Sequence, residues 1–146
     1  MITLALGLFS GPAMAQTALE AWELDRAQVF DATDITVADF VWTARPIVVF
    51  AQSPNDPQFK QQMDLLNARI DDLAERDVII ITDTSPTPPS ALRTSLRPRA
   101  FMLAIIGKDG RTALRKPAPW DVREITRSID KMPLRQQEIK DRRVAQ

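Results

Sequence analysis

The amino-acid sequence predicts an α/β domain with three layers, in which a mixed sheet of four or five strands lies between helices on both faces. Three apolar runs rich in β-branched residues, 47–51, 78–81 and 101–106, are typical of strands that are buried on both faces. A long helical pattern separates the first two runs, and an Asp-Gly turn follows the third. These two connections predict a parallel pair followed by an antiparallel hairpin.

The helix between the first two strands has the clearest pattern. Asp56 is suited to cap its start, and Pro57 is suited to the first helical position. An apolar residue recurs every three or four positions, so we expect one continuous helix that ends near Arg76. The stripe consists of Phe59, Met63, Leu66, Ile70 and Leu73. With the strand at 78–81, this helix completes a right-handed βαβ unit.

The next segment predicts a short helix and a hairpin. Ser90 is suited to cap a helix that continues to Leu96, and the run Arg97-Pro98-Arg99 ends it. After the strand at 101–106 and its turn, residues 112–114 are expected to return antiparallel.

The last predicted helix begins at Asp121, which has the spacing of a capping box with Glu124. Pro133 is expected to end or kink it. Trp120 is expected to pack against Ile125 at the helix entry, and the alternative is an exposed ring that stacks on a ligand. The apolar stripe of this helix is Val122, Ile125, Ile129 and Met132. The order of all these elements is that of a thioredoxin-like domain.

The first fifteen residues differ from the rest of the chain. They carry no charge and end in Ala13-Met14-Ala15, a pattern that signal peptidase accepts. We therefore expect a signal peptide cleaved near Ala15 and a periplasmic or secreted protein, although the basic residue usual at the start of such a peptide is absent. The alternative of a buried strand or helix is disfavoured by Gly7, Gly11 and Pro12.

The remaining chain divides into three predicted parts. Residues 16–39 form an N-terminal extension, 40–133 the thioredoxin-like domain, and 134–146 a polar C-terminal tail. Where the extension joins the domain, Phe40 and Trp42 are expected to face the same side of an extended segment, because side chains alternate in a strand.

Composition excludes several classes of function. The chain contains no cysteine and no histidine, which excludes thiol exchange, Cys–His catalysis and the usual zinc sites. Only 4 glycines are present, so a phosphate-binding loop is not expected. The 19 basic and 19 acidic residues balance, which argues against a nucleic-acid partner. We expect no cofactor, no metal and no transmembrane segment.

Candidate binding residues lie in the turn after the first strand, at Ser53, Asn55 and Asp56. In a thioredoxin-like arrangement the segment before the third strand lies beside this turn, so Arg97 or Arg99 is expected to approach it. A helix N-terminus beside an arginine favours anions. The alternative is a simple helix cap with a surface ion pair between Asp56 and Arg99, which contributes little energy.

The charges around these arginines are unevenly distributed. Between Arg93 and Lys116, Asp109 is the one acidic residue among seven basic ones. The basic residues are Arg93, Arg97, Arg99, Lys108, Arg111, Arg115 and Lys116.

Four stretches of the sequence resemble a known family. They are Arg45-Pro46 before the first strand, Glu75-Arg76-Asp77 before the second, Ile106-Gly107-Lys108-Asp109-Gly110 after the third, and Met132-Pro133-Leu134-Arg135-Gln136-Gln137-Glu138. Together they resemble the bacterial exported family of the domain of unknown function 4174, over about residues 40–143. Related domains occur in animal extracellular sushi-repeat-containing proteins. The resemblance implies a thioredoxin-like fold and export, and it implies no known reaction and no catalytic residues.

Two hypotheses about function follow. The first is an exported, non-enzymatic thioredoxin-like domain that binds a protein or a small anionic ligand. The alternative is a periplasmic enzyme or redox accessory that uses the cysteine-free polar site at 52–56 with Arg97 and Arg99. The absence of Cys, His and Tyr favours the first, because few side chains remain that act as nucleophile or base near neutral pH.

Overall fold

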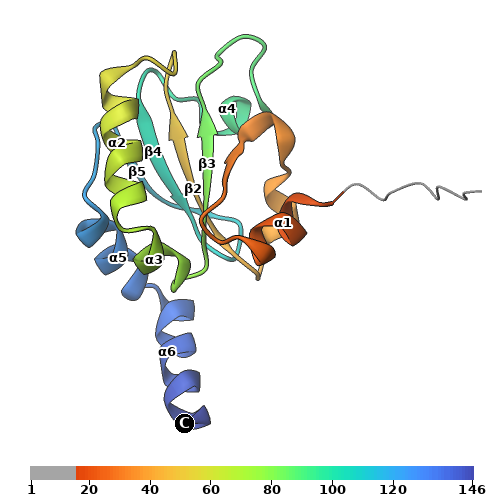
Figure 1. The fold of residues 1–146 in the computed structure, drawn as a ribbon, viewed down its shortest axis with the longest axis vertical. Helices are drawn as coiled ribbons and strands as arrows, with labels where there is room; N and C mark the ends of the chain where they lie inside the picture. Colours follow the sequence, from red (N-terminus) through yellow and green to blue (C-terminus); the bar gives the residue numbers. More distant parts are fainter. Residues whose placement is uncertain (1–15) are drawn as a thin grey trace, which may run out of the picture.

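The computed structural model describes residues 16–146 (Figure 1), so the predicted signal peptide at 1–15 lies outside the described residues. Its elements are helix α1 (Ala18–Leu24), strand β1 (Val29–Asp31), the 3-10 turns η1 (Ala32–Asp34) and η2 (Val37–Phe40), β2 (Arg45–Phe50), α2 (Pro57–Ala68), α3 (Ile70–Ala74), β3 (Val78–Asp83), α4 (Ala91–Leu96), β4 (Met102–Ile106), β5 (Thr112–Lys116), α5 (Val122–Asp130) and α6 (Pro133–Ala145).

The sheet has five strands in the order β1-β3-β2-β4-β5. Strands β1 and β2 both run parallel to β3, whereas β4 is antiparallel to β2 and to β5. The predicted mixed sheet is therefore confirmed, with the parallel pair and the hairpin where the sequence places them.

The core consists of two layers, one on each face of the sheet. Along β2, Ile47 and Val49 pack on one face while Val48 and Phe50 pack on the other, because side chains alternate along a strand. Helices α2, α3 and α5 cover the first face, and α1 and α4 cover the second (Figure 1). This double burial explains why the strands are continuous apolar runs.

The predicted single helix after β2 is wrong in one respect, because the structure contains two helices, α2 and α3. Arg69 separates them with φ −133° and ψ 41°, outside the helical region. Leu66 and Leu73, on either side of the break, are both fully buried. The apolar spacing continues across the break, so periodicity alone does not reveal it.

The N-terminal segment 16–39 supplies a strand and a large core side chain. β1 pairs with β3, and Trp22 of α1 is fully buried with its indole N–H donating to the carbonyl of Val78 at 3.2 Å. Phe40 is also fully buried, but Trp42 is exposed. The expected extended segment is wrong here, because η2 and a left-handed residue at Trp42 replace it.

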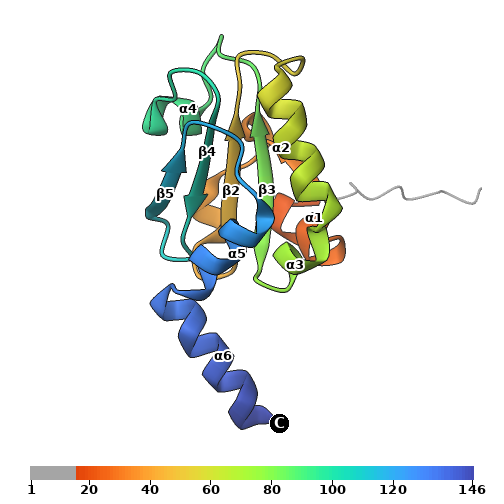
Figure 2. The same cartoon turned by 90° about the vertical axis from the view of Figure 1, so that its left-hand side faces the viewer.

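The C-terminal residues form a helix that leaves the body of the domain as an arm (Figure 2). Asp121 caps α5 by accepting a hydrogen bond from the amide of Arg123 at 2.7 Å. Pro133 begins α6 at the position where a helix tolerates proline. Across residues 16–146, no helix combines the length and the apolar character that crossing a membrane requires.

Ile80 of β3 gives a direct test of this core, because its side chain is 2% exposed. Replacing it with alanine should lower the free energy of unfolding by about 2–5 kcal/mol, since the lost methyl groups leave a cavity. Urea unfolding measures the change, and Val144→Ala on the exposed surface of α6 is the control, expected within about 0.5 kcal/mol of the parent. An Ile80→Ala effect as small as the control would contradict this packing.

Candidate functional site

A buried ion pair fixes the end of the sheet beside the predicted binding turn. The guanidinium of Arg93 in α4 donates to the Asp83 carboxylate at 2.8 Å and to the carbonyl of Ala51 at 2.9 Å. The hydroxyl of Ser90 donates to the same carboxylate and accepts a hydrogen bond from the Arg93 amide. Because Ala51 directly precedes the turn, this cluster anchors the turn to β3 and α4.

Within the turn, the predicted polar side chains make local hydrogen bonds. Ser53 accepts from the amide of Asn55 at 3.1 Å, and Asp56 accepts from the amide of Gln58 at 2.8 Å as the cap of α2. Asp56 therefore has the capping role that its position indicates.

The structure brings this turn and the segment 97–99 together. The side-chain amide of Gln52 donates to the backbone carbonyl of Arg99 at 3.3 Å. The two arginine side chains, however, remain exposed, and no ion pair joins Arg99 to Asp56 in the described part of the chain.

Arg97 and Arg99 instead line a groove of about 300 Å³ between the start of β4 and the end of β5. We call this the basic groove, because Arg115 and Lys116 of β5 also line it and no acidic residue does. None of the four cations forms an ion pair with another of the residues 16–146. Such a concentration of unneutralised positive charge attracts anions.

Two of the cations of the basic groove make contacts with neighbouring residues. The guanidinium of Arg115 donates to the carbonyl of Leu96 at 2.6 Å. The ammonium of Lys116 lies 4.7 Å from the centre of the Trp120 ring, which packs against the core cluster that contains Ile125. Sequence reasoning did not assign Arg115 and Lys116 to the site. The excess of basic residues between Arg93 and Lys116 is a signal in the sequence that could have indicated them, but it does not say which of the seven lie together.

Arg97 has an unusual backbone conformation for its role. It ends α4 with φ 50°, in the left-handed region, and its amide donates to the carbonyl of Arg93 at 2.9 Å. Glycine is the usual residue at such a position, because a side chain there costs about 1 kcal/mol. In return for this cost, the conformation places a cation among the residues that line the basic groove.

A second polar cluster lies at the opposite end of the sheet, where β2 begins, and we call it the charge network. Its hub is the fully buried guanidinium of Arg45, which donates to both carboxylate oxygens of Glu138 and to the carbonyl of Arg76. Glu138 also accepts from Lys108 at 2.7 Å, and Lys108 donates to Asp77 at 2.8 Å. These contacts join β2, the hairpin and α6.

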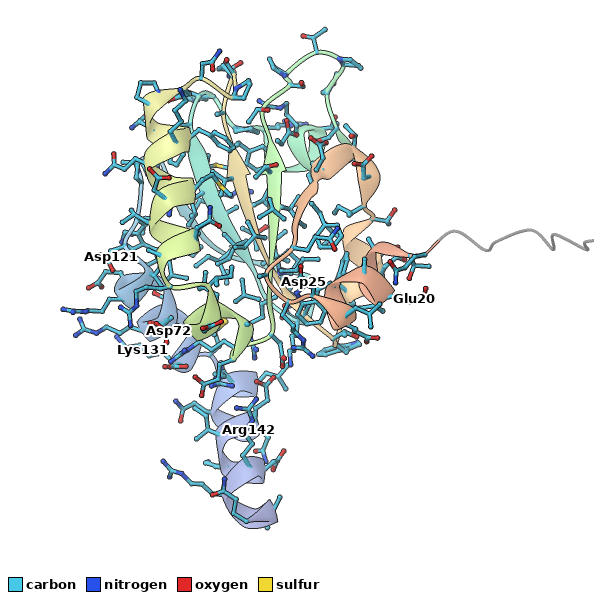
Figure 3. The ribbon with its side chains drawn as sticks, in the orientation of Figure 1. Glu20, Asp25, Asp72, Asp121, Lys131 and Arg142 are labelled. Carbon is cyan, nitrogen blue, oxygen red and sulfur yellow. The ribbon has the colours of Figure 1, made fainter. Side chains whose placement is uncertain are left out.

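The network continues to α3 and α5. Arg76 forms a two-point ion pair with Asp130, with both distances 2.9 Å, and Arg135 also contacts Asp130. Further along α6, Arg142 lies on the arm (Figure 3) and donates to the carbonyl of Glu75. The charge network therefore attaches α6 to the rest of the domain.

The electrostatics of the carboxylates follow from these contacts. Hydrogen bonds from Arg76, opposed by burial, hold the pKa of Asp130 below its usual range. Burial favours the neutral form of Asp77 and Glu138, but the cations that contact them outweigh it and lower the pKa of both. The three carboxylates are therefore ionised at neutral pH.

Neither cluster has the composition of a metal centre. Within residues 16–146 no three acidic side chains gather as a metal ion would require. The carboxylates of both clusters are already paired with arginine or lysine, which does not suit the binding of a dication.

Comparison with solved structures defines the class of fold. The structure is similar to the reduced 2-Cys peroxiredoxin of Plasmodium vivax, with a TM-score of 0.57 and 12% identity over 70% of this chain and 85% of that one. It is also similar to thioredoxin peroxidase I of Plasmodium yoelii, with a TM-score of 0.52 and 15% identity over 70% and 80% of the two chains. At these identities the likeness shows the fold alone, and the fold is thioredoxin-like.

The family is shown by the sequence. The model of the family described as "Domain of unknown function (DUF4174)" matches residues 36–138, and the chain belongs to this family. The resemblance to this family of unknown function is thereby confirmed. No curated protein matches the sequence. The matched region includes all four cations of the basic groove and ends at Glu138 of the charge network.

The charge network predicts a specific dependence of stability on pH. Asp77, Asp130 and Glu138 have lower pKa values in the folded protein than in the unfolded chain. The ionised carboxylates therefore stabilise the folded protein fully at a pH above their pKa in the unfolded chain. This stabilisation is lost as the pH falls through their pKa in the folded protein. Glu138→Gln removes the partner of buried Arg45 and should cost about 3 kcal/mol at pH 7.

Urea unfolding of the parent and of Glu138→Gln at several pH values tests this. The difference in unfolding free energy should shrink as the pH falls from about 5 towards 2, because Glu138 itself becomes neutral there. Glu124→Gln, which removes an exposed partner of Arg127, is the control and should change little at any pH. A pH-independent difference for Glu138→Gln would show that its charge is not what holds α6.

Proposed function

We propose that the protein is an exported, non-enzymatic thioredoxin-like module that binds an anionic ligand in the basic groove. The observation that carries this proposal is the set of four cations, Arg97, Arg99, Arg115 and Lys116, which share one groove that no carboxylate lines. Cations in a folded domain are usually paired or dispersed, so an unneutralised group in a concave site favours a negatively charged partner.

The chemistry of the groove favours binding over catalysis. Of the polar side chains beside it, Ser53 is engaged in a hydrogen bond within the turn and Asp56 in the cap of α2. The chain has no cysteine or histidine to supply a nucleophile or a base. Arginine presents several donors in a planar fork, which suits carboxylate, sulfate and phosphate groups. The expected ligand is therefore a small anion or an acidic group displayed by a protein.

The anchoring of the groove supports the same proposal. Arg93 and Asp83 hold the preceding turn rigidly, so little conformational freedom is lost when a ligand binds. Ser53 and Asn55 lie at the neighbouring turn, which Gln52 joins to Arg99, and the amides of Asn55 and Gln58 are engaged in hydrogen bonds within the turn and the cap.

Titration with sulfate, followed by backbone NMR, tests the site. Signals from residues 97–102 and 115–117 should shift, and the double variant Arg97→Gly/Arg99→Gln should abolish most of the shift at constant ionic strength. Glycine at position 97 relieves the left-handed strain in the folded protein but increases the entropy of the unfolded chain. Because these two effects oppose each other, the double variant should stay folded, and its free energy of unfolding should differ from that of the parent by less than about 1 kcal/mol.

The matched control is Arg123→Gln, an exposed arginine of α5 outside the groove, which should leave the titration unchanged. Sulfate shifts that are uniform over the surface, or that survive the double variant, would remove the basic groove as the binding site.

Export has its own test. The uncharged segment that ends at Ala13-Met14-Ala15 should direct cleavage after Ala15, because small residues at these two positions fit signal peptidase. Expression of the complete gene in a Gram-negative host, followed by N-terminal sequencing of the periplasmic fraction, should give Gln16 as the first residue. Changing Ala13 and Ala15 together to Lys should block this cleavage, and intact Met1 in the cytosol of the unmodified protein would contradict export.

A further inference from the structure

A second groove, of about 430 Å³, lies at the other end of the sheet, where β2 begins. It lies between the turn that joins β4 to β5 and the turn that joins α5 to α6. Its volume is in the range of sites that hold small molecules. We call it the Trp42 groove, and the residues that determine its character are Trp42, Met132, Leu134, Arg45, Lys108 and Arg111.

Trp42 is placed in this groove at a conformational cost. Its φ of 66° lies in the left-handed region, which is unusual for a large side chain. The amide of Trp42 donates to the carbonyl of Lys108 at 2.7 Å, which holds the backbone in this conformation. The side chain is nevertheless 68% exposed, whereas Phe40 two residues earlier is fully buried. Core packing therefore does not account for the position of the Trp42 ring, and the exposed ring is available to pack against an apolar ligand.

Further apolar surface continues from the ring. Met132 and Leu134, on either side of the start of α6, line the same groove, and Leu134 is exposed. A ligand body of one ring or a short aliphatic chain fits against three such side chains in this volume.

The polar side of the groove carries an excess of positive charge. Arg45 and Lys108 line it and belong to the charge network. In the described residues the network joins five cations to only three carboxylates, namely Arg26, Arg45, Arg76, Lys108 and Arg135 with Asp77, Asp130 and Glu138.

Two further features add to this positive charge. Arg111 lines the groove and forms no ion pair with any residue from 16 to 146. The start of α6 has no side-chain cap, so it adds the partial positive charge of a helix N-terminus. Asp109 is the single carboxylate among the lining residues.

We propose that the Trp42 groove binds a small carboxylic acid with an apolar body. The body packs against Trp42, Met132 and Leu134, and the carboxylate pairs with Arg111 in the field of the buried cations. This site is distinct from the basic groove, and the proposal does not depend on anion binding there. The neutral form of the same ligand leaves the excess positive charge without a partner, so it binds much more weakly.

Titration with 3-phenylpropionate and with its neutral amide tests both parts of the proposal. The chain has 3 tryptophans, whose indole N–H signals report separately in NMR. The signal of Trp42 should shift with the acid, while those of buried Trp22 and of Trp120 should not. Calorimetry should give an affinity at least tenfold higher for the acid than for the amide.

Variants then separate the two kinds of contact. Trp42→Gly suits the left-handed backbone, so the melting temperature should stay close to that of the parent while binding is lost. Arg111→Gln should lower the affinity for the acid at least fivefold and leave the affinity for the amide unchanged. Arg123→Gln, outside both grooves, and the double variant Arg97→Gly/Arg99→Gln should bind as the parent does.

Four results would overturn the proposal. They are equal affinity for the acid and the amide, a shift at Trp120 in place of Trp42, binding that survives Trp42→Gly in a folded protein, and preference for a longer peptide ending in phenylalanine over the free acid. The second result would assign the acid to the basic groove, and the last would assign this surface to a protein C-terminus.

Discussion

The structure depends first on the neutralisation of Arg45, a guanidinium that is 1% exposed at the start of the central strand β2. A buried charge without a partner costs several kcal/mol, and Glu138 is the side chain that supplies the opposite charge, at 2.9 Å. Glu138 lies on α6, so the first part of α6 must remain attached to the end of the sheet as long as Arg45 stays buried. The same requirement brings Lys108 of the hairpin to Glu138 and Asp77, and it thereby fixes the walls of the Trp42 groove.

A second buried arginine has the corresponding role at the other end of the sheet. Arg93 and Asp83 join the ends of β2 and β3 to α4, and the basic groove is built outside this cluster. The chain contains no cysteine, so no disulfide restrains either end, and these paired charges together with the two apolar layers hold the loops in place. The two grooves thus lie at opposite ends of one rigid sheet, each beside its own buried ion pair.

The difference between what the sequence predicts and what it does not has a physical cause. Strands such as 78–81 are recognisable because burial on both faces requires every residue to be apolar, and Asp56 and Ser90 are recognisable because capping is a local interaction. The Arg45–Glu138 pair spans 93 residues, and no local pattern links its members. The break at Arg69 is hidden for a related reason, since the apolar period continues through it. For the site, the position of Arg97 and Arg99 near the turn at 52–56 follows from the order of elements in a thioredoxin-like fold. The positions of Arg115, Lys116 and Trp42 depend on how the β4–β5 hairpin packs, which the sequence does not reveal.

Backbone strain connects the two candidate sites to the ion pairs. In the described part of the chain, the non-glycine residues with positive φ are Trp42, Asp77 and Arg97. Trp42 and Arg97 each line one groove, and Asp77 belongs to the charge network that supports the Trp42 groove. Left-handed conformations at such residues persist only where surrounding contacts determine them, and here the contacts are the hydrogen bonds from Trp42 to Lys108 and from Arg97 to Arg93. Both acceptor residues also have their side chains in ion pairs. The hydrogen bonds and the ion pairs together support an exposed aromatic ring and an exposed guanidinium at positions where glycine is the usual residue.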